Sequence, residues 1–144
     1  PKAIDGVRAF TGAEQFNEFL AASRVLVNLL PLTPETANVM NQDTLGRLRP
    51  GAYVINVARG AHLVEEDLLA LIDSGHVAGA TLDVFRTEPL PAGHAFWNHS
   101  RITITPHTSA RTLRDESIAQ IARKMAALER GEAVAGIVNP ARGY

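Results

Sequence analysis

The chain has 144 residues, 46% of them hydrophobic, which is enough for one domain with a packed core and argues against disorder. Its formal net charge is −1 and forms no basic stripe, so neither nucleic acid nor an anionic membrane is an expected partner. It has no cysteine, which excludes disulfides and thiolate sites, and no membrane-length apolar run or secretory leader, so we expect a cytoplasmic protein.

Strand-like and helix-like segments alternate along the chain. The strand-like segments are runs of Val, Ile and Leu, and the helix-like ones repeat apolar residues at three- and four-residue spacing. In chain order, the sequence predicts a strand at 7–10, a helix at 16–20, a strand at 24–30, a helix at 41–48, a strand at 53–57, a helix at 64–74, a strand at 77–84, a loop at 85–100, a strand at 101–105, a helix at 112–130 capped by Thr112, and an irregular tail at 132–144.

This alternation predicts an α/β fold with a parallel sheet and right-handed crossovers. In open sheets of this kind, ligands bind beyond the carboxyl ends of the strands. Four polar segments directly follow predicted strands, and they are 31–36, 58–59, 83–88 and 107–109. Because parallel strands end at one edge, these segments should lie together and form a site.

Three ionisable side chains carry the chemistry of these segments. His107 is the candidate acid or base, since imidazole titrates nearest neutral pH, and Glu88 is its expected partner. The planar guanidinium of Arg59 suits a carboxylate or a carbonyl oxygen. Taken one at a time, the three could equally be a strand-ending histidine, a solvated loop glutamate and a surface arginine. Their common location favours a site.

The remaining histidines are weaker candidates. His76 follows the helix-ending Gly75, and His62, His94 and His99 lie in or near loops with no evident partner. None has metal-ligand spacing, so no metal is predicted.

Asp83 ends an otherwise apolar strand, where a carboxylate usually accepts a specific hydrogen bond, the alternative being that it simply caps a loop. The chain contains no G-x-G-x-x-G and no Walker loop. If a dinucleotide binds, its pyrophosphate-binding turn therefore lies outside this sequence.

Several motifs resemble those of the D-isomer-specific 2-hydroxyacid dehydrogenases. They are LPLTPET at 30–36, VARG at 57–60, DVF at 83–85 with EPL at 88–90, and TPH at 105–107. Trp97 and the ending ARGY at 141–144 are most similar to the glyoxylate/hydroxypyruvate reductase A branch. Four motifs in order, spread over most of the chain, make the resemblance specific.

The resemblance implies an incomplete Rossmann-like, doubly wound sheet that lacks the glycine-rich first βα unit and the substrate domain. Residues 1–110 would be the C-terminal part of the NAD(P)-binding domain, and 111–144 a helix and tail returning to the substrate domain. In the family's strand order, 7–10 and 24–30 would flank two absent strands. The exposed edge at 24–30 should then be covered by another chain, by a rearranged segment 1–23 or by a proteolytic partner, so we expect a homodimer or association through this edge.

The resemblance also implies roles. Arg59 would bind the substrate carboxylate and carbonyl, His107 would protonate the carbonyl oxygen, and Glu88 would hold the imidazole. The cofactor would be NAD or NADP, with NADP favoured by the branch. Its expected contacts are Leu30, Pro31, Thr36, Val57, Ala58, Arg59, Asp83, His107 and Ser109.

The implied substrate is a small 2-oxo acid, with glyoxylate or hydroxypyruvate favoured, and the isolated chain is expected to be inactive. Two alternatives stay open. One is a non-catalytic dinucleotide-sensing or dimerisation module of the same fold, and the other is a different reaction of the family, such as phosphoglycerate or formate oxidation.

Overall fold

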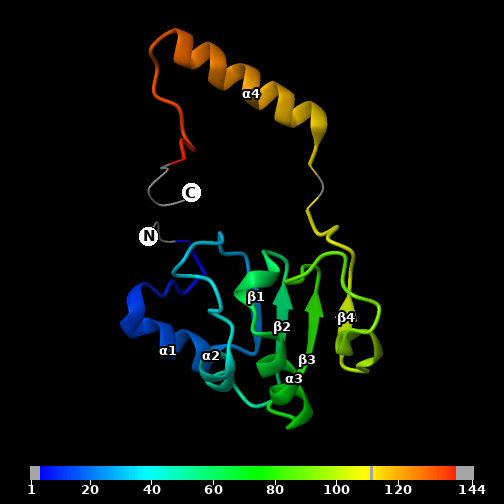
Figure 1. The fold of residues 1–144 in the computed structure, drawn as a ribbon. Helices are drawn as coiled ribbons and strands as arrows, with labels where there is room; N and C mark the ends of the chain where they lie inside the picture. The colour runs from blue at the N-terminus through cyan, green and yellow to red at the C-terminus, as the bar shows by residue number, and fades with distance from the viewer. Residues whose placement is uncertain (1–3, 111, 139–144) are drawn as a thin grey trace. The chain divides into compact units, whose positions relative to one another are not determined.

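Figure 1 shows the computed structural model of the chain, which describes residues 4–110 and 112–138. The chain forms two compact units, Pro1–His107 and Thr108–Tyr144. The ending at 141–144, part of the motif resemblance, lies outside the described residues.

The first unit is built on a sheet of four parallel strands in the order β1-β2-β3-β4. Their bounds are Val25–Asn28 for β1, Ala52–Asn56 for β2, Val77–Leu82 for β3 and Ile102–Ile104 for β4. The predicted Rossmann-like α/β fold is therefore confirmed. The register pairs Asn28 with Asn56, Asn56 with Leu82, and Leu82 with Ile104, so all four strands end in one row.

The helices of this unit are α1 (Gly12–Ala22), α2 (Gln42–Gly46) and α3 (Glu65–Asp73), with short 3-10 turns η1 (Gly60–His62) and η2 (Ala95–Asn98). In sequence, α1 precedes the first strand, and the other helices and turns of this unit lie between strands. Asn41 caps α2 in a reciprocal capping box with Thr44, and α3 has three acidic residues in its first turn. The turn η2 falls within the segment predicted as a loop.

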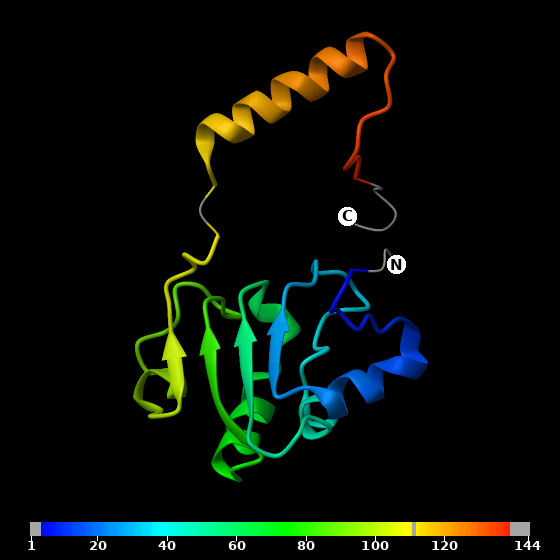
Figure 2. The ribbon, with the colours of Figure 1, turned by 180° about the vertical axis from the view of Figure 1, so that it is seen from behind.

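The core lies between the sheet and α2 and α3. Leu45 of α2 and Leu68 and Ile72 of α3 are fully buried, as are Val54 of β2 and Leu82 of β3. In Figure 2, the strands face the viewer and α3 lies behind them, so these helices cover one face of the sheet.

The predicted strand at 7–10 is wrong. Its backbone is irregular, Val7 is 59% exposed, and the segment packs on α1 through Phe10, whose ring lies 5.8 Å from that of Phe19. A strand must pair its N–H and C=O groups with a neighbour. In the described residues this segment has no neighbouring strand, so its apolar pattern cannot become a ladder.

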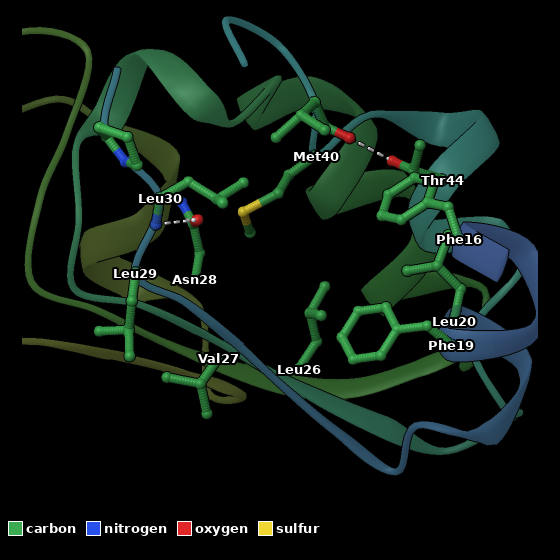
Figure 3. A pocket seen from close by; sticks show the side chains of 12 residues that line it. Phe16, Phe19, Leu20, Leu26, Val27, Asn28, Leu29, Leu30, Met40 and Thr44 are labelled. Carbon is green, nitrogen blue, oxygen red and sulfur yellow. Dashed lines mark hydrogen bonds between the residues drawn. The ribbon is translucent and has the colours of Figure 1, made fainter. Parts of the chain in front are cut away.

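The outer edge of β1 is unpaired within the described residues. Val25 and Val27 are 54% and 47% exposed, so the alternative of cover by a rearranged segment 1–23 is wrong for the described residues of that segment, 4–23. Figure 3 shows the apolar groove beside this edge, into which Leu26, Met40 and Phe19 point, while Val27 points away. The groove has a volume of about 320 Å³.

The second unit contains one helix, α4 (Arg114–Glu129), in its described residues. Its N-cap residue is Leu113, which makes no side-chain cap, so the prediction of Thr112 as the cap is wrong. Gly131 ends the helix with φ 72°, as a C-terminal glycine does. Four apolar side chains spaced by three and four residues are exposed, and these are Ile118, Ile121, Met125 and Leu128.

Candidate functional site

The loops that follow the strands start from a common level. The Asp83 N–H donates to the Asn56 carbonyl and the Thr105 N–H to the Leu82 carbonyl, both at 3.0 Å, so the ladder continues one residue past the strands. Asp83 is 1% exposed, and the Thr105 hydroxyl donates to its carboxylate. The predicted specific hydrogen bond of Asp83 is thus present, and it ties the β3 loop to the β4 loop.

His107 and Glu88 form a direct pair. The His107 Nδ1 lies 2.8 Å from Glu88 Oε2, and Glu88 Oε1 accepts the Phe85 N–H at 2.9 Å. These two bonds, the one to His107 first, hold the pKa of Glu88 below its usual value near 4.5. His107 sits in the left-handed region at φ 53°, which few non-glycine residues adopt. With Nδ1 on Glu88, Nε2 is the ring nitrogen that can serve a ligand.

The pair lies on the wall of a cavity of about 650 Å³. Apart from the pair, the lining is apolar and comes from Phe85, Pro89, Leu90, Trp97, Ile104 and Pro106. Trp97 is held by its indole N–H, which donates to the Pro91 carbonyl at 2.8 Å. An apolar cavity with a few convergent polar groups is the usual form of a small-molecule site.

Arg59 lies on the neighbouring loop, after β2. Its side chain is exposed, forms no ion pair with a described residue, and donates from Nη1 to its neighbour's carbonyl, that of Ala58, at 2.6 Å. Gly60 packs directly against the loop after β3, since a Cβ on it would lie 1.9 Å from the Phe85 carbonyl carbon. The Arg59 loop therefore rests on the loop that carries Glu88, although Arg59 does not line the cavity.

Two buried asparagines, which sequence reasoning missed, end β1 and β2. Asn28 accepts the Leu30 N–H at 3.1 Å and donates to Asn56 Oδ1 at 3.1 Å. Asn56 also accepts the Ala58 N–H at 3.2 Å and donates to the Arg59 carbonyl at 3.1 Å. They are 5% and 0% exposed. The sequence does carry a signal for them, because an asparagine stands at the end of each of these two largely apolar strands.

Three histidines expected to lack an evident partner each have at least one, so that prediction is wrong. His62 is fully buried between two backbone carbonyls. His94 lies 3.4 Å from the Glu65 carboxylate, and the Nε2 of His99 lies 3.2 Å from that of Asp73.

Six of the nine predicted cofactor contacts follow β1 and β2, whereas Asp83 follows β3 and His107 follows β4. Leu30 and Pro31 are exposed, and the Thr36 hydroxyl donates to the Pro31 carbonyl at 2.8 Å, which closes their loop. Val57 is half-buried and Ala58 is buried.

The roles of these residues toward a dinucleotide stay sequence-based predictions. The exposed Leu30 and Pro31 would offer an apolar surface to a flat ring, whereas Asp83 is 1% exposed and its carboxylate already accepts the Thr105 hydroxyl. Ser109 belongs to the second unit and stays a sequence-based prediction.

In the described parts of the chain, no group of three or more His, Cys, Asp or Glu residues is arranged to hold a metal ion. None of the helices there has the length and apolar content needed to cross a bilayer.

Fold and site together define a Rossmann-like nucleotide-binding domain. The family described as "D-isomer specific 2-hydroxyacid dehydrogenase, NAD binding domain" matches residues 4–109, and the chain belongs to this family. It is 56% identical over its whole length to glyoxylate/hydroxypyruvate reductase A of Serratia proteamaculans, covering 46% of that protein. The corresponding reductase of Yersinia enterocolitica is 50% identical with the same coverage.

Solved structures agree. A D-isomer specific 2-hydroxyacid dehydrogenase of Xanthobacter autotrophicus in complex with NADPH and MES matches with a TM-score of 0.94 at 45% identity, over 100% of this chain and 60% of that one. An NADPH-dependent glyoxylate/hydroxypyruvate reductase of Sinorhizobium meliloti in complex with NADP and sulfate matches with a TM-score of 0.93 at 33% identity, over 100% and 47%. The chain spans about half the length of the curated relatives it matches.

Proposed function

We propose that this chain is the part of a reductase that carries its catalytic residues. The reductase moves hydride between NADPH and a small 2-oxo acid, glyoxylate or hydroxypyruvate. The observation that carries the proposal is the His107–Glu88 pair, at 2.8 Å, on the same strand-end row as the Arg59 loop. The names of the Serratia and Yersinia relatives and the nucleotides in the solved structures support the substrate and cofactor.

Arg59 binds the substrate in this proposal. Its side chain is exposed and forms no ion pair with a described carboxylate, so its guanidinium can donate two hydrogen bonds to the carboxylate of a 2-oxo acid and polarise the adjacent carbonyl.

His107 and Glu88 handle the proton. When bound, the nicotinamide supplies the hydride to the carbonyl carbon. His107 donates a proton from Nε2 to the carbonyl oxygen, which yields the 2-hydroxy acid, and takes a new proton from solvent. Glu88 orients the ring through Nδ1 and stabilises the imidazolium form before the transfer. No observation favours the alternative of a non-catalytic module.

The open edge of β1 supports a proposal about partners. The exposed Val25 and Val27 and the adjoining apolar groove form a surface that an isolated chain would leave to water. A second copy or another chain covers this edge in the proposed assembly. Val27→Lys should then lower the association measured by analytical ultracentrifugation, and an unchanged sedimentation profile would refute this role. A cytoplasmic location stays a prediction from composition.

A chimera tests the activity. In it, this chain replaces the matching part of the Serratia reductase, and NADPH oxidation is followed with glyoxylate and with hydroxypyruvate. We expect turnover that is lost in Arg59→Gln and His107→Gln. A folded chimera that oxidises NADPH with neither acid, while the parent reductase does, would refute the proposal.

A further inference from the structure

We propose that His62 is a positioning residue that joins the loop after β1 to the loop after β2, and so sets Arg59 relative to Leu30 and Pro31. What the two loops bind rests on the proposed function. The link between them rests on the geometry of the chain alone.

The His62 ring spans the two loops. It is 0% exposed and lies in η1, with Nδ1 3.1 Å from the Arg59 carbonyl oxygen and Nε2 3.3 Å from the Pro31 carbonyl oxygen. Arg59 is three residues away in sequence, whereas Pro31 is 31 residues away and belongs to the other loop. The ring therefore lies between carbonyls of two segments and can donate to either of them.

The buried asparagines close this bridge into a circuit. From the Pro31 side, the Leu30 N–H bonds Asn28, Asn28 bonds Asn56, and Asn56 bonds the Arg59 carbonyl, from which His62 returns to Pro31. Hydrogen bonds in a buried circuit are strengthened by the low local dielectric and hold their members in one arrangement. A shift of either loop would change the lengths of these contacts and so displace the other loop.

The number of hydrogen-bond donors on the His62 ring distinguishes a positioning role from simple packing. Both partners of His62 are acceptors, and a neutral imidazole has one N–H, so it can serve only one carbonyl at a time. An asparagine amide reaches about as far as Nδ1, and a glutamine amide about as far as Nε2. His62→Asn therefore keeps the donor toward Arg59, His62→Gln keeps the donor toward Pro31, and His62→Phe keeps neither.

The test uses the ligand-free, isotope-labelled chain and two amide signals in heteronuclear NMR. The Leu32 N–H shares its peptide group with the Pro31 carbonyl, and the Gly60 N–H shares its peptide group with the Arg59 carbonyl, so each signal reports one end of the bridge. We expect His62→Asn to move the Leu32 signal and spare Gly60, and His62→Gln to do the reverse. If both variants move both signals alike, the ring only fills space and the proposal is wrong.

A second substitution tests whether a change in the loop after β1 reaches the loop after β2. Thr36→Val removes the hydroxyl that donates to the Pro31 carbonyl. In the otherwise unchanged chain it should move the Gly60 signal, and in the His62→Phe background, where only the path through the two asparagines remains, it should move that signal less. A Gly60 response of the same size without the His62 ring would overturn the proposal. If His62→Phe does not fold, the same comparison is made in His62→Asn, where the donor toward Pro31 is missing.

The chimera described above adds a ligand readout. There, His62→Gln should raise KM for glyoxylate by about two- to tenfold, the value of one hydrogen bond, and leave KM for NADPH unchanged. His62→Asn should do the opposite. An inactive chimera would refute the proposed function while the NMR result on His62 stands, so the two failures are distinguishable.

Discussion

The β1–β2 half and the β3–β4 half of the strand-end row are held in different ways. On the first side, Asn28, Asn56 and His62 are buried and bond mostly to backbone groups. On the second, His107 and Glu88 are 50% and 34% exposed and bond to each other. Buried amides fix where a loop lies, whereas an accessible ionisable pair can exchange a proton with a ligand. The accessible pair proposed to transfer the proton therefore lies on one half of the row, and the two buried amides and His62 lie on the other.

The largest expected effect comes from replacing His107, which removes the proposed proton donor and leaves the buried asparagines and His62 unchanged. In the Serratia chimera, His107→Gln should lower kcat by about 10²- to 10⁴-fold, the usual contribution of a general acid, with little change in thermal unfolding. Steady-state kinetics measure this loss.

His99→Gln is the matched control, since His99 also pairs with a carboxylate, that of Asp73, but lies away from the row. It should keep the chimera's turnover. Equal losses in the two variants would show that His107 has no special part in the reaction.

Gly60→Ala should break the contact between the two halves. The added Cβ would lie 1.9 Å from the Phe85 carbonyl carbon, and this neighbour is backbone, which cannot rotate away. We expect a loss of about 3 kcal/mol in the free energy of unfolding, measured in urea. Gly46→Ala is the control, because its Cβ would meet no atom within 4 Å. A Gly60→Ala chain as stable as this control would contradict the close approach.

The asparagine pair gives a smaller effect confined to the first half. Asn56→Leu removes the acceptor for Asn28 and for the Ala58 N–H, and should cost about 2 kcal/mol. Asn28→Leu should cost a similar amount for the same reason.

The double variant should cost less than the sum of the two, because each single change leaves an unpaired buried amide that the double change removes. Denaturant unfolding of all four proteins completes the cycle. Strict additivity would mean that the two amides do not depend on each other.

The same contrast explains which features could be predicted from the sequence. The strands and the His107–Glu88 pair were predictable, because apolar runs and ionisable side chains are properties of the residues themselves. His62 and the asparagines were not, since most of their partners are backbone groups that every residue carries. Which backbone group a side chain meets is decided by packing between distant segments.

The failed strand at 7–10 has a related cause. Its apolar pattern suits a strand, but pairing depends on a neighbour that the described residues do not supply. The misplaced cap at Thr112 is local instead, since the helix begins one residue later, after Leu113. Helix ends commonly differ from their predicted positions by one or two residues.

The smallest effect concerns the stability that the exposed pair adds. Because the folded-state pKa of Glu88 lies below its usual value near 4.5, its ionised form stabilises the fold fully above that pH, and this contribution is lost as pH falls through the lowered pKa. Glu88→Gln should therefore reduce the free energy of unfolding at neutral pH by less than about 1 kcal/mol, since an exposed pair contributes little. In acid the difference between the two proteins should vanish.

Urea titrations at several pH values measure this difference, and His107→Ala supplies the control. The bond to His107 is the larger cause of the lowered pKa of Glu88, and the Phe85 N–H is the second. Glu88→Gln should hence have a smaller, still pH-dependent effect in the His107→Ala background. A difference of the same size in both backgrounds would assign the stabilisation to the Phe85 bond alone, and the exposed half of the row would then be held by its backbone, as the buried half is.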